Sequence, residues 1–175
     1  MDLIQQVKDA GIIGAGGAGF PTYAKLESAA EYMLMNAAEC EPYITVDYRE
    51  CLDNSWDVMS GVHLLKDMLN FKKVIIAVED NKPDAIKLMT EKAAAYPGIE
   101  VVPLKVKYPQ GGEKQLIDAV IGRQVPAPPA IPINVGAVVQ NVGTAYAVYE
   151  AVQKNKPLFE RVVTVTGKSL KSPSN

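Results

Sequence analysis

Three glycines near the start of the chain, Gly14, Gly16 and Gly19, follow the spacing G-x-G-x-x-G within the stretch GIIGAGGAGFPTYAKL. Glycine has no Cβ, so a main chain rich in it approaches a ligand closely and points successive N–H groups inward at an anion. Pro21 is typical of a first helical turn, and Lys25 follows one turn later. The stretch therefore predicts a phosphate-binding loop. The alternative for the glycines is a flexible turn at a helix junction, and the alternative for Lys25 is a solvated surface lysine.

The glycine spacing alone also suggests the dinucleotide-binding fingerprint, but the surrounding residues do not fit that motif. The fingerprint needs a strand before its glycines and an uninterrupted helix directly after them. Here the preceding residues 3–11 have the apolar spacing of a short amphipathic helix, and Phe20-Pro21 follows the last glycine. The loop is therefore predicted to hold a phosphate in some other setting.

The rest of the chain alternates apolar runs typical of buried strands with helical patterns. Asp47 is a plausible N-cap for one long helix that places His63 on its core-facing stripe. Repeated strand–helix alternation predicts an α/β fold with an open, mainly parallel sheet and helices on both faces. The predicted strands are 32–38, 72–80, 99–106, 136–141 and 161–167, and the predicted helices are 3–11, 47–69, 83–96, 113–122 and 142–154, with a further helix starting at 21.

Composition excludes several classes of function. The net charge is −2 with both signs interleaved, so the basic face needed to bind nucleic acid is missing. Two cysteines are too few to ligate an iron–sulfur cluster, and one histidine predicts no metal site. No run approaches the roughly 20 apolar residues of a membrane span. We expect one compact domain in the cytoplasm, with reduced thiols and no direct membrane insertion.

The combined motifs resemble a known family. The runs GAGGAGFPTYAKL and NAAECEPYITVD are similar to the flavin-binding domain shared by the 51 kDa subunit of respiratory complex I and the C component of the Rnf electron-transport complex. The cobalamin reductase of diol utilisation and the electron-transfer partner of proline reductase also resemble it. Later runs, YPQGGEKQ, QNVGT and ERVVTVTG, follow in the family's order. The resemblance implies a Rossmann-like FMN-binding domain over 1–160, with 161–175 the truncated start of a following domain or linker.

The resemblance also assigns residues to roles around the flavin and NADH. It implies that Glu41 and Glu113 are catalytic carboxylates and that Phe20 and Glu41 lie where NADH binds. The residues it implies for FMN binding are Gly14, Gly16, Gly17, Lys25, Asn36, Glu39, Tyr108, Gly111, Gly112, Gln140, Asn141 and Thr144.

The implied activity is transfer of hydride from NADH to FMN, with electrons passed on to an iron–sulfur domain or subunit outside this chain. This would place the protein beside a membrane complex or in a microcompartment. Two departures from complex I matter: its loop arginine is replaced by Ala15, and the counterparts of its adenine-stacking phenylalanines are Ser28 and Ala130. The alternatives are a conventional NAD(P)-dependent reductase without flavin and a non-catalytic assembly module of a redox complex.

Overall fold

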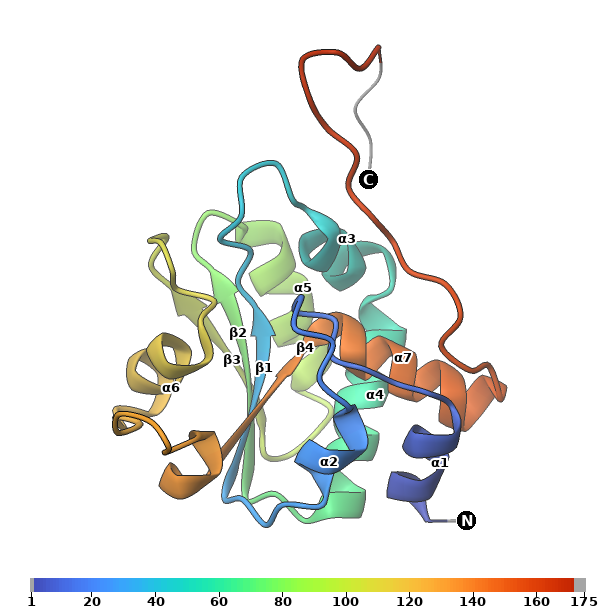
Figure 1. Ribbon diagram of the computed structural model, residues 1–175, viewed down its shortest axis with the longest axis vertical. Helices are drawn as coiled ribbons and strands as arrows, with labels where there is room; N and C mark the ends of the chain where they lie inside the picture. Colours follow the sequence, from blue (N-terminus) through green and yellow to red (C-terminus); the bar gives the residue numbers. More distant parts are fainter. Residues whose placement is uncertain (1, 172–175) are drawn as a thin grey trace.

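The computed structural model describes residues 2–171 of the chain, the side chain of residue 68 excepted (Figure 1). Within these residues no helix is both long enough and apolar enough to cross a membrane. The elements, in chain order, are α1 (Leu3–Asp9), α2 (Thr22–Leu26), β1 (Tyr32–Ala37), α3 (Val46–Asp53), α4 (Ser55–Leu69), β2 (Lys73–Glu79), α5 (Pro83–Ala93), β3 (Ile99–Leu104), α6 (Glu113–Ile121), the 3-10 helix η1 (Pro132–Val135), β4 (Ala137–Asn141) and α7 (Val142–Lys154).

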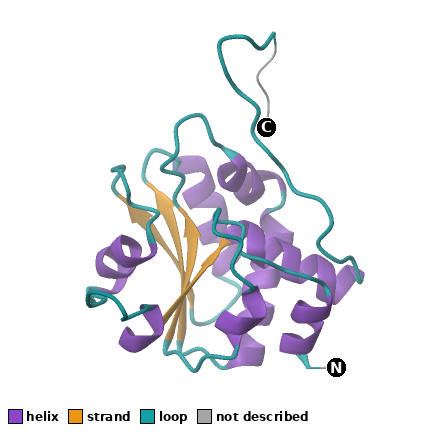
Figure 2. Cartoon of the chain, in the orientation of Figure 1, coloured by secondary structure: helices purple, strands orange, loops and turns teal. Residues whose placement is uncertain are grey.

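The four strands form one parallel sheet in the order β3-β2-β1-β4, which confirms the predicted α/β class. Side chains alternate across the sheet, so Met33 and Met35 of β1 enter the larger apolar cluster while Leu34 enters the smaller one. Both clusters are buried, which explains why these strands read as continuous apolar runs. Helices cover both faces, as Figure 2 shows, with α6 on one side and α4, α5 and α7 on the other.

The connections explain why the strand order reverses at β1. The chain passes from β1 to β2 and on to β3 in one direction, and the connecting helices α3, α4 and α5 pack in the larger cluster. It then returns past β1 to β4 through α6, which packs on the opposite face. Right-handed crossovers require this change of face when the direction changes. The strand order therefore reverses between β1 and β4, and open α/β sheets bind ligands at the carboxyl edge beside such a point.

The predicted long helix over 47–69 is wrong in its start and in its continuity. Asn54 leaves the helical conformation (φ −117°, ψ 25°) and separates α3 from α4. Asp47 is not the N-cap, because it lies inside the first turn of α3. The carboxylate of Glu39 accepts hydrogen bonds there from the N–H groups of Asp47 (2.8 Å) and Tyr48 (3.1 Å). A cap supplied from an earlier segment leaves no local signature.

Two further expectations are wrong. Residues 161–167 form no strand; they run along the molecule as an extended segment with a single bridge residue. Val162 and Val163 are more than half exposed there, because no neighbouring strand covers them. The side chain of His63 lies at the edge of the core and not inside it: it is 40% exposed, its Nε2 lies 3.3 Å from Oδ2 of Asp67, and its ring packs on Tyr96. Residues 172–175 of the segment predicted to begin another domain lie outside the described residues.

Gly61 allows α4 and α7 to cross closely, which predicts a large effect of Gly61→Ala. A Cβ at this position would lie 1.9 Å from the backbone oxygen of Ala145. Alanine normally favours a helix over glycine by about 1 kcal/mol, but here the helices must separate. We expect urea unfolding to show a loss of about 2 to 3 kcal/mol. Ser60→Ala, on the exposed side of α4, should change stability by about 0.5 kcal/mol or less. Equal stability of the two variants would contradict this packing.

Candidate functional site

A cavity of about 700 Å³ lies at the carboxyl ends of β1 and β4, where the strand order reverses. Segments distant in the sequence form its walls: the glycine loop, the residues after β1, the start of α3, the turn before α6, the start of α7 and the extended segment after α7. Its lining residues include Gly16, Gly17, Asn36, Glu39, Glu41, Asp47, Glu50, Tyr108, Gly111, Gly112, Asn141, Gly143 and Arg161.

The glycine loop is closed at its base and held against α7. The N–H of Gly14 donates to the Phe20 oxygen (2.8 Å), and an antiparallel bridge pairs Ile13 with Pro21. The N–H of Ala15 donates to Oγ1 of the buried Thr144 (2.9 Å). Within the described chain the amides of Gly16 and Gly17 donate to no protein group. The loop therefore offers donors to the cavity from a fixed position, as an anion site requires.

Asn36, near the end of β1, joins that strand to the turn before α6. Its Nδ2 donates to the oxygen of Gly111 (2.9 Å), and its Oδ1 accepts from the N–H of Ala38 (3.0 Å). The N–H of Gly111 lies 2.9 Å from Sγ of Cys40. A Cβ at Gly111 would come within 2.7 Å of the oxygen of Ala38, so only glycine fits here. The two segments form one continuous wall of the cavity.

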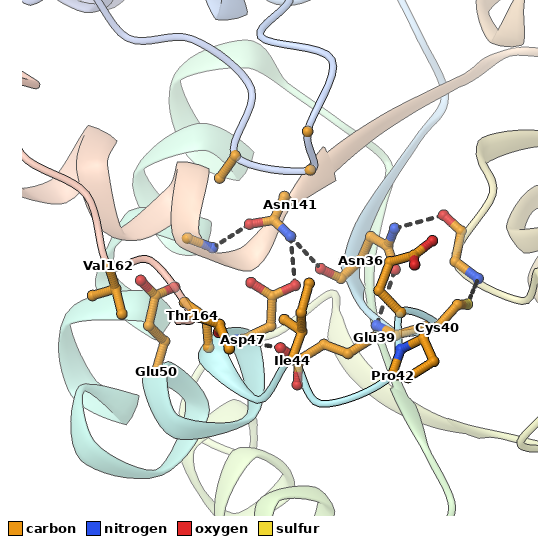
Figure 3. A pocket seen from close by; sticks show the side chains of 18 of the residues that line it. Asn36, Glu39, Cys40, Pro42, Ile44, Asp47, Glu50, Asn141, Val162 and Thr164 are labelled. Atoms are coloured by element: carbon orange, nitrogen blue, oxygen red, sulfur yellow. Dashed lines mark hydrogen bonds between the residues drawn. The ribbon is translucent and has the colours of Figure 1, made fainter. Parts of the chain in front are cut away.

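Asn141 lies at the carboxyl end of β4, paired with Asn36 of β1 (Figure 3). Its Oδ1 accepts from the N–H of Gly143 (2.8 Å) and so caps α7. Its Nδ2 donates to Oδ2 of Asp47 (2.7 Å) and to the oxygen of Asn36 (3.5 Å). This one amide therefore connects β1, β4, α3 and α7.

Two carboxyl groups at the cavity are easily protonated. Burial, together with the neighbouring Glu39 carboxylate, raises the pKa of Asp47 to about 7, although the hydrogen bond from Asn141 opposes the rise. Burial also raises the pKa of Glu50 to about 7, opposed by the positive charge of Arg161. Both groups therefore exchange protons near neutral pH, which is a property of many functional sites.

Glu39 is placed differently from its neighbours. Its side chain is 2% exposed, accepts the two N–H groups that open α3 and lies 3.3 Å from Nζ of Lys82. The carboxylate oxygens are thus committed to the protein, although the residue lines the cavity. Glu41, two residues on, is exposed at the cavity and is available to a ligand.

A second, more apolar cavity of about 320 Å³ lies beside β4 and receives three of the predicted residues. Lys25 contacts Glu113 there and donates to the oxygen of Val139 (3.0 Å), while its Nζ lies 5.8 Å from the centre of the Phe20 ring. Ile131 and Pro132, from the proline-rich connection, complete much of the wall. Phe20 and Ile131 are about half exposed, so the cavity opens to solvent.

The structure therefore divides the predicted site residues into groups. Phe20, Lys25 and Glu113 line the second cavity, and three residues line neither cavity: Gly14 closes the loop, Gln140 is buried on β4, and Thr144 anchors Ala15. The predicted residues at the main cavity are Gly16, Gly17, Asn36, Glu39, Glu41, Tyr108, Gly111, Gly112 and Asn141.

Sequence reasoning missed Asp47 and Glu50 as site residues, together with Arg161. The spacing of Asp47 and Glu50, three residues apart after NAAECEP, is the only local signal for the first two, because it places both on one face of α3. Arg161 belongs to a segment that reads as a strand, so nothing local indicates its role.

The raised pKa of Asp47 predicts how stability depends on pH. The unfolded chain loses this proton near the ordinary value of 3.8 and the folded protein only near 7, so the folded state holds more protons between them. The free energy of unfolding should therefore fall as pH rises from about 4 to about 7. The free energy of unfolding of Asp47→Asn, relative to that of wild type, should therefore increase by on the order of 2 kcal/mol as pH rises from 5 to 8.

Chemical denaturation at several pH values measures this difference. Asp53→Asn is a suitable control, since that exposed carboxylate contacts Arg49 on the surface of α3. Wild type and Asp47→Asn with parallel stability profiles from pH 5 to pH 8 would refute the assignment.

Comparison with known proteins identifies what this chain is similar to. The family model described as the Nuo51 FMN-binding domain matches residues 7–150. The chain is 45% identical over 178 residues to the C component of the proton-translocating ferredoxin:NAD(+) oxidoreductase complex of Clostridium ljungdahlii, over 99% of this chain and 38% of that protein. It is 44% identical to the C component of the ion-translocating oxidoreductase complex of Serratia proteamaculans, over 99% of this chain and 25% of that protein.

A solved structure has the same fold. An NAD+-reducing NiFe hydrogenase in the air-oxidized state superposes with a TM-score of 0.74 and 28% identity, covering 86% of this chain and 30% of that one. The chain thus spans at most about two fifths of the length of these relatives.

Proposed function

The chain belongs to the Nuo51 FMN-binding domain family, and on that premise we propose that it binds FMN in the main cavity, accepts hydride from NADH and passes electrons to an iron–sulfur partner. The relatives named above are components of oxidoreductase complexes, which places the family in electron transfer. The observation that carries the proposal is the position of the main cavity at the carboxyl ends of β1 and β4, where the strand order reverses.

The groups at this cavity fit FMN. A phosphate needs N–H donors, which the loop amides of Gly16 and Gly17 and the start of α7 supply. A flat ring needs walls without projecting side chains, and the Gly111–Gly112 turn is such a wall. The cavity volume also lies within the usual range for small-molecule sites, about 300 to 1,000 Å³. When bound, the flavin would supply the exchange between two-electron and one-electron chemistry.

The chain's own ionisable residues would tune that chemistry. Asp47 and Glu50, each with a pKa of about 7, are partly protonated near neutral pH, so they hold protons beside the cavity without adding full negative charge. Glu41 is exposed at the rim, where an approaching nicotinamide would meet it. Glu113 contacts Lys25 at the second cavity and would act there with that lysine.

The second cavity supports NADH as the donor. Its walls are mostly apolar and include the exposed ring of Phe20, which is suited to one face of an adenine. Ser28 also lines this cavity, and the resemblance to complex I implies an aromatic ring at its position in that family. We therefore expect NADH to bind through one aromatic contact and the Lys25–Glu113 pair. The name of the Clostridium relative, a ferredoxin:NAD(+) oxidoreductase, supports a nicotinamide nucleotide as a redox partner.

The electron acceptor lies outside this chain in our proposal. An iron–sulfur cluster needs about four cysteine ligands, and this sequence has two cysteines. The longer relatives have room for such a domain, since the chain spans 38% and 25% of them. Their names describe ion-translocating complexes, so we propose that this domain works beside a membrane complex; a microcompartment is the other setting that the resemblance implies.

Two alternatives remain as outcomes of the test. A conventional NAD(P)-dependent reductase would bind NADH without retaining FMN. The position of the glycine loop disfavours it, because the loop precedes α2 and β1 instead of following the first strand. A non-catalytic assembly module would retain FMN, but NADH would not reduce it.

Reconstitution with FMN followed by anaerobic mixing with NADH tests the proposal. We expect reconstitution to give a yellow protein with one flavin per chain. Stopped-flow mixing with NADH should then remove the flavin absorbance at roughly 450 nm. Tight NADH binding without FMN would favour the reductase, and bound FMN that NADH does not bleach would favour the assembly module.

Asn36→Ala should weaken FMN binding at least about tenfold, or about 1.4 kcal/mol. The hydrogen bond from Asn36 to the oxygen of Gly111 holds the Gly111 turn against β1, and without it this wall of the main cavity is no longer fixed. Fluorescence titration with FMN measures the change. Asn81→Ala, at an exposed turn after β2, is the matched control and should bind as wild type does. Equal affinities of the two variants would argue against this cavity as the flavin site.

A further inference from the structure

We propose that Arg161, in the extended segment after α7, binds the phosphate of the flavin and thereby fixes this segment along the cavity. The inference rests on the proposed function, since it takes FMN as the occupant. It adds a residue and a segment that the glycine loop does not include. The chemical class recognised is a phosphate monoester dianion carried by a flavin.

Arg161 reaches the glycine loop from the far end of the chain. Its Nη2 donates to the oxygen of Ala15 (3.3 Å), a residue whose own N–H is bound by Thr144 in the first turn of α7. The guanidinium therefore lies close to the loop amides and to the start of α7, where an anion would be held. In Figure 3 Val162 and Thr164, its neighbours in the segment, lie beside Glu50 at the same wall.

Charge at the cavity singles out Arg161. Among the described residues that line it, the other ionisable side chains with a formal charge are acidic: Glu39, Glu41, Asp47 and Glu50. A dianion that enters such a cavity needs a positive charge beside it, and among the described lining residues Arg161 supplies that charge. The nearby cation Lys82 pairs with Glu39 and Glu79 and does not line the cavity.

The guanidinium also has bonding capacity to spare. Within the described part of the chain Arg161 forms no ion pair, and its hydrogen bond goes to one carbonyl oxygen. Arginine presents five N–H donors in a planar fork that matches two phosphate oxygens at once. A phosphate beside Gly16 and Gly17 would therefore accept hydrogen bonds both from their N–H groups and from the guanidinium of Arg161.

The segment itself explains why this contact matters. Val162 is 52% exposed and Val163 is 64% exposed, so few apolar contacts hold residues 161–166 to the body of the protein. Polar contacts such as the one from Arg161 to Ala15 must then set its position. A bound phosphate would strengthen that attachment, and in Figure 1 this segment is the stretch that leads away from the domain toward the carboxyl terminus.

Comparing FMN with riboflavin, which lacks the phosphate, tests the inference on the full chain. Fluorescence titrations should show that Arg161→Gln weakens FMN binding at least tenfold and changes riboflavin binding less than twofold. Arg161→Lys should recover part of the FMN affinity, because it restores the charge without the fork. Arg49→Gln, which breaks an exposed contact with Asp53 on α3, is the control and should leave both affinities unchanged.

Tryptic cleavage after Arg161, followed by mass spectrometry on wild type, is a second readout. FMN should slow this cleavage and riboflavin should not. Equal losses of FMN and riboflavin affinity in Arg161→Gln, or an unchanged FMN affinity, would overturn the inference while leaving the flavin site in place. If wild type binds neither flavin, the proposed function itself fails, and the inference fails with it.

Discussion

The reversal of strand order between β1 and β4 is the constraint on which the rest of the structure depends. The chain reaches β4 through α6 on one face of the sheet, whereas α3 and α4, which follow β1, and α7, which follows β4, pack on the other face. The carboxyl edge of the sheet beside these two strands is therefore lined by loops and helix starts from several parts of the chain. Asn141 satisfies the backbone at this point by capping α7 and by bonding to Asp47 and Asn36. The open space that remains is the main cavity, and its polar groups are a direct consequence of where two parallel strands end.

The same constraint brings carboxyl groups together. Glu39 caps α3, and the helix so begun carries Asp47 and Glu50 into the cavity wall. Burial of these acids costs less when they hold protons, which is why the pKa of each rises to about 7. Arg161 and the loop amides line the same cavity. The site therefore combines groups that hold protons with groups that bind an anion, which suits an anionic cofactor whose reduction takes up protons.

Much of this follows from the sequence. The apolar runs that became β1, β2 and β4 are largely buried on both faces, and the run that became the edge strand β3 is partly buried, so their pattern was sufficient to predict a parallel sheet. The resemblance to the family of complex I and Rnf flavin domains is confirmed. Contacts between distant segments were beyond reach. The capping of α3 by Glu39, the turn of Lys25 toward Val139 and the approach of Arg161 to Ala15 each depend on the completed fold. The segment 161–167 has the composition of a strand but no partner among the described strands.

The most direct test of the central claim is an NMR titration of the isotopically labelled chain with FMN that follows the backbone amide signals. The account predicts that the signals of Gly16, Gly17, Gly111, Gly112 and Gly143 shift together and saturate at one equivalent, because these amides surround the main cavity. Saturable binding that leaves these five signals unchanged and instead shifts the amides of Ala24, Ser28 and Ile131, at the second cavity, would contradict it.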